Sequence, residues 1–280
     1  MIIWLASYPK SGNTWLRFFI ISLLMGKKVD LNLNHLKAII SYPDKTHFKG
    51  LLKNVLDIDE IAKNWINSQN RINSDKNFRF FKTHNMFIKY KDNSFTDVNN
   101  TLATIHIVRD PRNVITSVKN HFSFDEDEAY NFMSNINTSI KKKNSSDYRT
   151  WVLLSSWSNH YKSWTKSKNF RKLLIKYEDF EENKARTFRD IIIFVNTLLK
   201  NSEGVNNKKL ERAIETTNFE VLKKKEEEEG FEESAYSNES KRKMFFNLGF
   251  NNKWKELLRK EIREKIEKQF YTEMNELDYL

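Results

Sequence analysis

The sequence predicts an α/β fold in which helices flank a central, mostly parallel sheet. Short apolar runs rich in β-branched and aromatic residues alternate with longer segments of helical periodicity. The runs show no polar–apolar alternation, as expected for strands that are covered on both faces. The chain has 280 residues, with no internal repeat and no recognisable linker, so we expect a single domain over residues 1–280.

The predicted strands alternate with the predicted helices along the chain. The strands are expected over residues 2–7, 78–81, 102–108 and 173–177. Helices are expected over residues 15–25, 111–121, 151–166 and 185–199, and a charged surface helix over 254–273. Asp110 is a suitable N-cap for the second helix, because Pro111 stands at its first position. The polar segments 125–147 and 223–243 are expected to be loops, either solvated surface or a lid over a site.

The composition favours an anionic partner. Lys and Arg outnumber Asp and Glu by 48 to 37, a formal net charge of +11. This excess suits a nucleotide, a nucleic acid, an acidic polymer or a membrane surface, or else a solvated lysine-rich surface. The absence of cysteine excludes disulfides and thiolate metal sites. Arg17 interrupts the apolar segment 15–25, so we interpret that segment as a buried helix and expect a cytoplasmic protein with no transmembrane segment.

The segment YPKSGNTW, residues 8–15, joins the first predicted strand to the first predicted helix. A tight loop between a strand and a helix presents backbone N–H groups to an anion. Gly12 lets the backbone approach a ligand closely, and Lys10 supplies a mobile positive charge. Further side-chain donors are Ser11, Asn13 and Thr14. The chain has no G-x-x-x-x-G-K-[ST] segment, so a P-loop-type kinase remains an alternative that lacks its most specific motif. A capped helix that binds no ligand is a further alternative for this segment.

Two further segments carry polar residues at predicted strand ends. In HIVRDPRNVITSV, residues 106–118, Arg109 ends the third strand and Ser117 lies in the second turn of the next helix. An arginine there can donate two hydrogen bonds to a phosphate, and a hydroxyl can add a third. In FFKTHNMF, residues 80–87, Lys82 and His84 follow the second strand at the same sheet edge. A single histidine in such a place is more often structural than catalytic.

Together, the three segments resemble motifs of the sulfotransferases that use 3′-phosphoadenosine-5′-phosphosulfate (PAPS). YPKSGNTW is similar to the family's 5′-phosphosulfate loop, with Asn13 at a position that is usually Thr. The resemblance implies a three-layer, P-loop-like fold, with PAPS as the sulfuryl donor and no metal. It implies that residues 10–14 hold the 5′-phosphosulfate, and that Arg109 and Ser117 hold the 3′-phosphate.

The Lys-Thr-His tripeptide at residues 82–84 resembles the one that contributes the family's catalytic base. This resemblance implies that His84 removes the acceptor proton and that Lys82 binds the sulfonate oxygens. Lys10 would meet the charge that develops on the leaving phosphate oxygen. Weaker resemblances in LLIKYEDF, residues 173–180, and TTNFEVLK, residues 216–223, place more residues beside the adenine. The implied adenine contacts are Trp15, Tyr177, Thr217 and Phe219.

The sequence departs from the family pattern near its C-terminal end. Where the family has Arg-Lys-Gly, the alignment to Trp254 gives Asn247, Leu248 and Gly249, so two cations are missing. Gly249 still offers its backbone N–H, and the basic residues 241–243 could supply the lost charge; alternatively, the 3′-phosphate is bound more weakly. The family's C-terminal dimer motif is also absent, which leaves the oligomeric state open.

The expected function is transfer of a sulfuryl group from PAPS to a hydroxyl, which yields a sulfate ester and adenosine 3′,5′-bisphosphate (PAP). The acceptor is expected to be a small molecule, a sugar or a glycolipid, with phenols and small alcohols included. A kinase that acts on a small molecule is the alternative enzyme. A nucleic-acid-binding module would rest only on the diffuse positive charge, because no recognition motif is present, and we expect no nucleic acid partner.

Overall fold

The computed structural model describes residues 1–25, 31–140, 150–234 and 242–280. The described chain divides into two compact units. The sheet unit comprises Met1–Tyr8, Ile39–Ile107 and Met133–Leu174, and the helical unit comprises Pro9–Ala38, Val108–Phe132 and Ile175–Leu280. The single domain over residues 1–280 stays a prediction.

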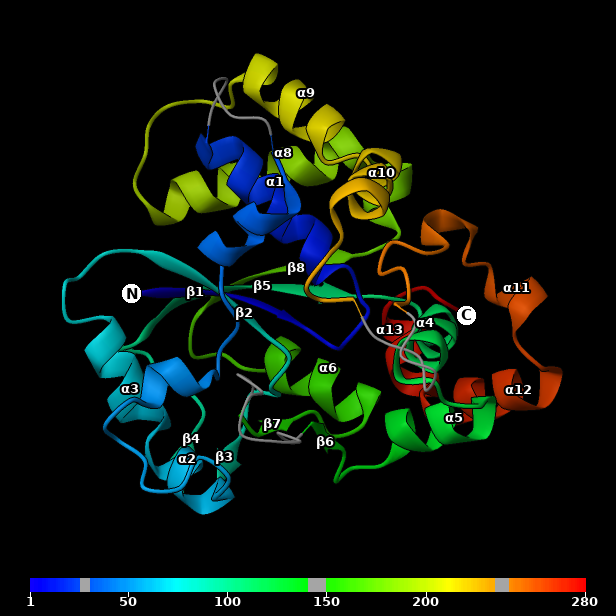
Figure 1. Cartoon of the computed structure of the whole chain (residues 1–280), viewed down its shortest axis with the longest axis horizontal. Coiled ribbons are helices and arrows are strands. Elements are labelled where there is room, and N and C mark those ends of the chain that lie inside the picture. The colour runs from blue at the N-terminus through cyan, green and yellow to red at the C-terminus, as the bar shows by residue number, and fades with distance from the viewer. Residues whose placement is uncertain (26–30, 141–149, 235–241) are drawn as a thin grey trace. The chain divides into compact units, whose positions relative to one another are not determined.

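The main sheet confirms the four predicted strands. Its order is β2 (Arg79–Thr83), β1 (Ile2–Ser7), β5 (Thr101–Val108) and β8 (Arg171–Lys176), as Figure 1 shows. β1 pairs in parallel with both β2 and β5, and its residues are all buried. Ala6 is in register with Thr83, so Ser7 and His84 follow at neighbouring strand ends.

An aromatic core fills the sheet unit. The ring of Trp4 lies 5.4 Å from the rings of both Tyr42 and Phe95, and Trp65 stacks on Trp151 at 5.8 Å. Helix α6 (Trp157–Thr165) packs against β1. The other elements of this unit are η3 (Lys45–Phe48), α2 (Ile58–Lys63), α3 (Trp65–Ile72), β3 (Lys89–Tyr90), β4 (Asn93–Ser94), β6 (Ser139–Ile140) and β7 (Val152–Leu153).

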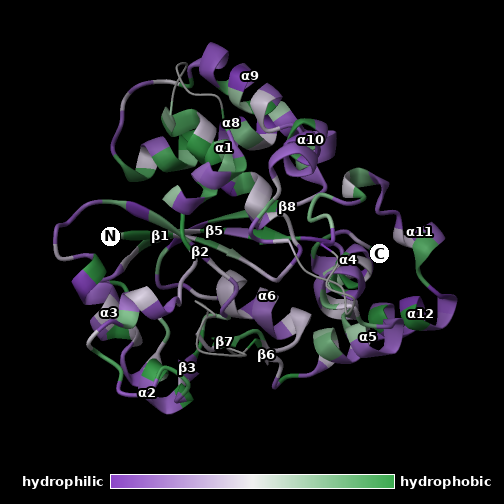
Figure 2. Ribbon diagram, in the orientation of Figure 1, coloured by the Kyte–Doolittle hydropathy of each residue, from purple (hydrophilic) through white to green (hydrophobic). Residues whose placement is uncertain are grey.

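The helical unit packs around α1 (Asn13–Met25), whose first nine residues are buried. Helix α1 contacts α9 (Asn207–Thr216), and α9 contacts α8 (Lys184–Leu198), as Figure 1 shows. Figure 2 shows α1 as largely hydrophobic and α10 (Phe219–Glu229) as largely hydrophilic. The remaining elements are η2 (Leu33–Ala38), α4 (Pro111–Phe122), α7 (Asp179–Glu182), η4 (Gly249–Asn251), α11 (Trp254–Leu257), α12 (Lys260–Gln269) and α13 (Tyr271–Glu276). Helix α5 (Glu126–Ser134) runs from this unit into the sheet unit.

The predicted helix over residues 151–166 is wrong in its first third. Residues 152 and 153 pair with β6 in a short antiparallel ladder. Helix α6 begins only at Trp157, because the side chain of Ser156 accepts a hydrogen bond from the backbone N–H of Asn159 and caps it. The predicted helix over 254–273 is also interrupted, since Leu258 is extended and separates α11 from α12.

The two predicted loops contain more structure than expected. Asp125 and Glu128 form a reciprocal capping pair that starts α5 inside the first loop. Helix α10 continues to Glu229 inside the second, where Glu226 is buried and accepts the backbone N–H groups of Phe245 and Phe246. This carboxylate therefore joins two segments and is not solvated surface. Residues 141–147 of the first segment and 235–241 of the second lie outside the described residues.

Within the described ranges, no helix is both long and apolar enough to span a bilayer.

Candidate active site

The loop after β1 has the backbone of an anion cradle. Lys10 (φ 67°) and Gly12 (φ 101°) both adopt the left-handed region, and together they turn the chain into α1. The carbonyl of Gly12 accepts the N–H groups of Trp15 and Leu16 at 3.1 and 3.2 Å. The N–H groups before these have no acceptor within the helix, and at a helix start they favour a phosphate.

Gly12 is required by a close approach within the helical unit. A Cβ at this position would lie 2.5 Å from the ring of Tyr177, well inside van der Waals contact. The sequence predicts that this glycine allows the close approach of a ligand. In the structure, Gly12 also allows the Tyr177 ring to pack directly against the loop.

The loop side chains are buried and polar. The hydroxyl of Ser11 is buried and has no hydrogen-bond partner among the described residues. Thr14 donates from Oγ1 to the Glu233 carboxylate at 3.2 Å, and Lys10 Nζ lies 3.7 Å from the centre of the Phe245 ring. A buried hydroxyl without a partner beside a helix start is suited to an anion that would accept its proton.

Glu233 also pairs with the buried Arg17 at 2.6 Å, where the two side chains are 26% and 4% exposed respectively. Glu233→Ala is expected to lower the free energy of unfolding by about 2–4 kcal/mol, because it strips a buried guanidinium of its carboxylate. Urea denaturation monitored by tryptophan fluorescence measures this loss. The matched control is Glu232→Ala, which breaks an exposed pair with Lys37 and should cost less than about 1 kcal/mol. Equal losses of unfolding free energy in the two variants would contradict a stabilising role for the pair of Glu233 and Arg17.

Arg109 is held on several sides beside the loop. Its Nη1 donates to the Lys10 carbonyl at 3.1 Å and to Ser117 Oγ at 3.3 Å. The guanidinium lies over the Tyr177 ring at 4.0 Å from the ring centre, a favourable stacking arrangement for arginine. Its Nε is buried without a partner in the part of the chain that the structure describes. The predicted pair of Arg109 and Ser117 is therefore brought together and joined to the loop.

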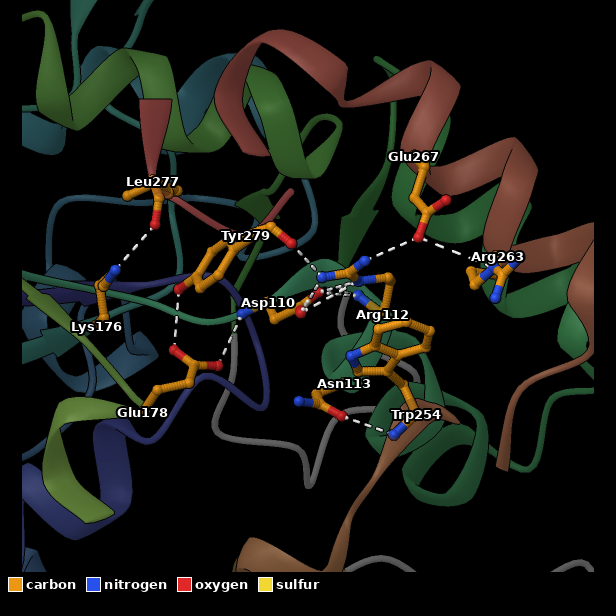
Figure 3. A network of polar contacts seen from close by, with 10 residues as sticks. All are labelled: Asp110, Arg112, Asn113, Lys176, Glu178, Trp254, Arg263, Glu267, Leu277 and Tyr279. Atoms are coloured by element: carbon orange, nitrogen blue, oxygen red, sulfur yellow. Dashed lines mark hydrogen bonds and ion pairs between the residues drawn. The ribbon is translucent and has the colours of Figure 1, made fainter. Parts of the chain in front are cut away.

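A polar network, drawn in Figure 3, supports the backbone next to Arg109. Asp110 caps α4 and accepts hydrogen bonds from the guanidinium of Arg112. Glu178 accepts the Asp110 N–H at 3.1 Å and the Tyr279 hydroxyl at 2.9 Å. Burial raises the pKa of the Glu178 carboxyl above its usual value. The C-terminal residues thus stabilise the strand end that carries Arg109.

Aromatic rings gather on the predicted adenine side of the helical unit. Phe250 lies 5.4 Å from Trp15, 5.8 Å from Tyr177 and 6.4 Å from Phe219. A Cβ on Gly249 would lie 2.6 Å from the Phe219 ring, so Gly249 is in close contact with the same cluster. The structure therefore groups three predicted adenine residues and adds Phe250, which sequence reasoning missed.

Thr217 differs from the other predicted adenine residues. It is fully buried, and its hydroxyl donates to the Ala213 carbonyl at 2.6 Å. This bond helps to end α9, for which Thr217 is the C-cap. A role for Thr217 in binding the base stays a prediction.

Arg242 and Lys243, two of the three basic residues proposed to replace the missing Arg-Lys, have other contacts in the structure. Lys243 Nζ donates to the Asn120 carbonyl at 2.7 Å and to Ser123 Oγ at 2.9 Å, at the end of α4. The guanidinium of Arg242 packs against Gly230. Residue 241 lies outside the described residues. Besides Arg109, the side chain that bonds to Ser117 is the uncharged Asn252, whose Nδ2 lies 3.0 Å from Ser117 Oγ.

His84 belongs to the sheet unit and is half-buried. Its Nδ1 lies 2.7 Å from the Ser7 carbonyl oxygen and 3.3 Å from Ser7 Oγ. A carbonyl oxygen only accepts hydrogen bonds, so Nδ1 carries the proton. In the neutral ring Nε2 is then the basic nitrogen. This is the tautomer that a general base requires.

The segment around His84 is anchored by α6. His160 Nε2 donates to the His84 carbonyl at 3.2 Å, and burial lowers the pKa of His160 to about 3, which keeps it neutral. The indole of Trp164 donates to the Asn85 carbonyl at 3.0 Å. Lys82 is fixed through its backbone, which pairs with Ile40 and Tyr42. Lys82 lies in β2, and His84 directly follows Thr83, the last residue of this strand.

None of the described side chains forms a group of three or more metal-ligating residues.

Comparison with known proteins identifies the family. The sulfotransferase domain family model matches residues 2–278. Sulfotransferase 1B1 of Canis lupus familiaris is 26% identical over 223 residues, which cover 78% of this chain and 65% of that protein; the match thus spans just under two thirds of that curated relative.

Solved structures share the fold. Retinol dehydratase in complex with androsterone and the inactive cofactor PAP is 17% identical, with a TM-score of 0.60 over 98% of this chain and 80% of that chain. Mouse sulfotransferase SULT7A1 complexed with PAP is 16% identical, with a TM-score of 0.55 over 99% of this chain and 84% of that chain. These likenesses confirm the predicted P-loop-like α/β fold with its mostly parallel sheet flanked by helices. Because the family model covers nearly the whole sequence, the chain belongs to the sulfotransferase family.

Proposed function

We propose that this chain transfers a sulfuryl group from PAPS to the hydroxyl of a small molecule. The observation that carries the proposal is the bond from Arg109 Nη1 to the Lys10 carbonyl, with Ser117 on the same nitrogen. This hydrogen bond joins the loop at the start of α1 to Arg109 and Ser117, which are suited to bind a second anionic group, and all of these residues belong to the helical unit. PAPS has such a pair of anionic groups, a 5′-phosphosulfate and a 3′-phosphate. The proteins of the two PAP complexes described above have the same fold.

The residues divide into binding and reacting groups. The N–H groups at the start of α1, with Ser11, Asn13 and Thr14, bind the 5′-phosphate, and Arg109 and Ser117 bind the 3′-phosphate. Trp15, Tyr177 and Phe219 contact the adenine, and the backbone N–H of Gly249 donates to the nucleotide. PAPS supplies the sulfuryl group and leaves as PAP when the bond between the sulfur and the phosphate oxygen breaks.

His84 performs the proton transfer in this proposal. Its Nε2 accepts the proton of the acceptor hydroxyl as the acceptor oxygen forms its bond to sulfur. The Ser7 carbonyl bond to Nδ1 stabilises the imidazolium that forms. Lys82 binds the sulfonate oxygens, and Lys10 neutralises the charge that develops on the leaving phosphate oxygen.

The acceptor is tested by transfer of labelled sulfate from PAPS to a panel of hydroxyl compounds. The panel holds a phenol, androsterone, retinol, a monosaccharide and a glycolipid, because the solved relatives bind androsterone or retinol. We expect labelled sulfate in at least one small phenol or alcohol. Label only in the monosaccharide or the glycolipid would show instead that the acceptor is a sugar or a glycolipid. Transfer from ATP but not from PAPS would overturn the proposal in favour of a kinase.

A further inference from the structure

The hydroxyl of Ser117 has two donors pointed at it. Arg109 Nη1 lies 3.3 Å and Asn252 Nδ2 lies 3.0 Å from Ser117 Oγ. A guanidinium nitrogen and an amide nitrogen can only donate. Ser117 Oγ therefore accepts both hydrogen bonds.

These two bonds determine what the Ser117 hydroxyl can still do. A serine hydroxyl has two lone pairs and one proton. With both lone pairs engaged, the proton is directed away from Arg109 and Asn252. The hydroxyl is left as a donor that requires an acceptor, and in this position an anionic oxygen is the suitable one.

Asn252 is itself fixed by its neighbours. It is 6% exposed, its Oδ1 accepts the Thr116 hydroxyl at 2.6 Å, and its Nδ2 donates to the Asn113 carbonyl at 2.9 Å. Because the Asn113 carbonyl can only accept, the amide nitrogen must face it, and this sets the orientation of the whole amide. Asn113 Oδ1 in turn accepts the Trp254 N–H (Figure 3), so the segment that carries Asn252 is tied to α4.

We infer that Asn252 is a positioning residue for recognition of the 3′-phosphate, acting through Ser117. The inference rests on the proposed function, since it assumes that PAPS is the ligand. Asn252 holds the Ser117 hydroxyl in its donating orientation without adding charge. It thereby gives this chain, which lacks the Arg-Lys pair before Gly249, a neutral means of strengthening the bond from Ser117 to the phosphate.

The test is a double-mutant cycle read out with two nucleotides. Dissociation constants for PAP and for AMP are measured by calorimetry for the wild type, Ser117→Ala, Asn252→Ala and the double variant. Asn252→Ala is expected to weaken PAP binding about 3–10-fold, the order of one neutral hydrogen bond, and to leave AMP binding within about 2-fold. In the Ser117→Ala background the same change should weaken PAP less than about 2-fold.

Two further variants sharpen the result. Asn252→Asp keeps the shape but places an acceptor beside Ser117, which captures the hydroxyl proton and adds negative charge, so PAP binding should fall by more than about 30-fold. Asn251→Ala alters an exposed neighbour and should change neither nucleotide's affinity. Thermal unfolding of each variant reports its folding.

The outcomes separate the inference from the proposed function. Equal wild-type affinity for PAP and AMP would overturn both. A preference for PAP, with additive losses from Ser117→Ala and Asn252→Ala, would overturn only the role of Asn252. Equal losses of PAP and AMP in Asn252→Ala would show that the residue merely supports the fold, and would also overturn that role.

Discussion

His84→Ala is expected to lower kcat for sulfuryl transfer by about 10²–10⁴-fold, the usual contribution of a general base, while the dissociation constant of PAP stays within about 2-fold of the wild type. The physical reason is the proton arrangement of the ring. The Ser7 carbonyl holds the proton on Nδ1 at 2.7 Å, so removal of the ring removes the basic Nε2. Initial rates with labelled PAPS and calorimetry with PAP measure the two quantities on the same preparation.

A matched control is His35→Ala. The ring of His35 accepts the backbone N–H of Asn32 near η2 and has no place in the proposed chemistry. We expect wild-type kcat in this variant. Loss of PAP binding together with activity in His84→Ala would contradict a catalytic role and assign His84 to the fold.

Arg109→Ala is expected to weaken PAP binding about 10–100-fold, because charge-assisted hydrogen bonds to a phosphate contribute about 1.5–3 kcal/mol. AMP lacks the 3′-phosphate, so its affinity should change by less than about 3-fold. Arg109→Lys keeps the charge but loses the planar fork and the stacking on Tyr177, so it should recover only part of the affinity. Calorimetric titrations with both nucleotides give the comparison.

The control for the charge change is Arg186→Ala, which removes an arginine that is 83% exposed. It should leave both nucleotides' affinities unchanged. If Arg109→Ala weakened AMP as much as PAP, the residue would be a general support of the loop through its bond to the Lys10 carbonyl, and its assigned role would be wrong.

Local patterns in the sequence were sufficient to predict the strands and the residues at their ends. β1 is a continuous apolar run that is buried throughout, and parallel strands deliver their end residues to one edge. His84 and Arg109 could therefore be chosen from their positions after strands. The start of α6 could not, because residues 151–154 are apolar and fit a helix as well as the short ladder to which residues 152 and 153 belong.

Contacts between distant segments could not be predicted. Glu233 bonds to Thr14 across 219 positions, and Asn252 bonds to Ser117 across 135; no periodicity encodes such pairs. Glu226 is one of several glutamates in a charged run, and its burial is explained by the hydrogen bonds that it accepts from the Ser234 hydroxyl and from the backbone N–H groups of Phe245 and Phe246. Phe250 could not be predicted either, because its ring partners Trp15, Tyr177 and Phe219 lie in distant segments of the sequence.

The most direct measurement is a calorimetric comparison of PAP with ADP on the wild-type chain. The two nucleotides each carry two phosphates and differ in whether the second lies on the 3′ oxygen or on the 5′ chain. The arrangement of Arg109 and Ser117 beside the loop predicts that PAP binds at least about 10-fold more tightly, the contribution of one charge-assisted contact. Equal affinities, or tighter binding of ADP, would contradict the assignment of these residues to a 3′-phosphate and would favour a kinase.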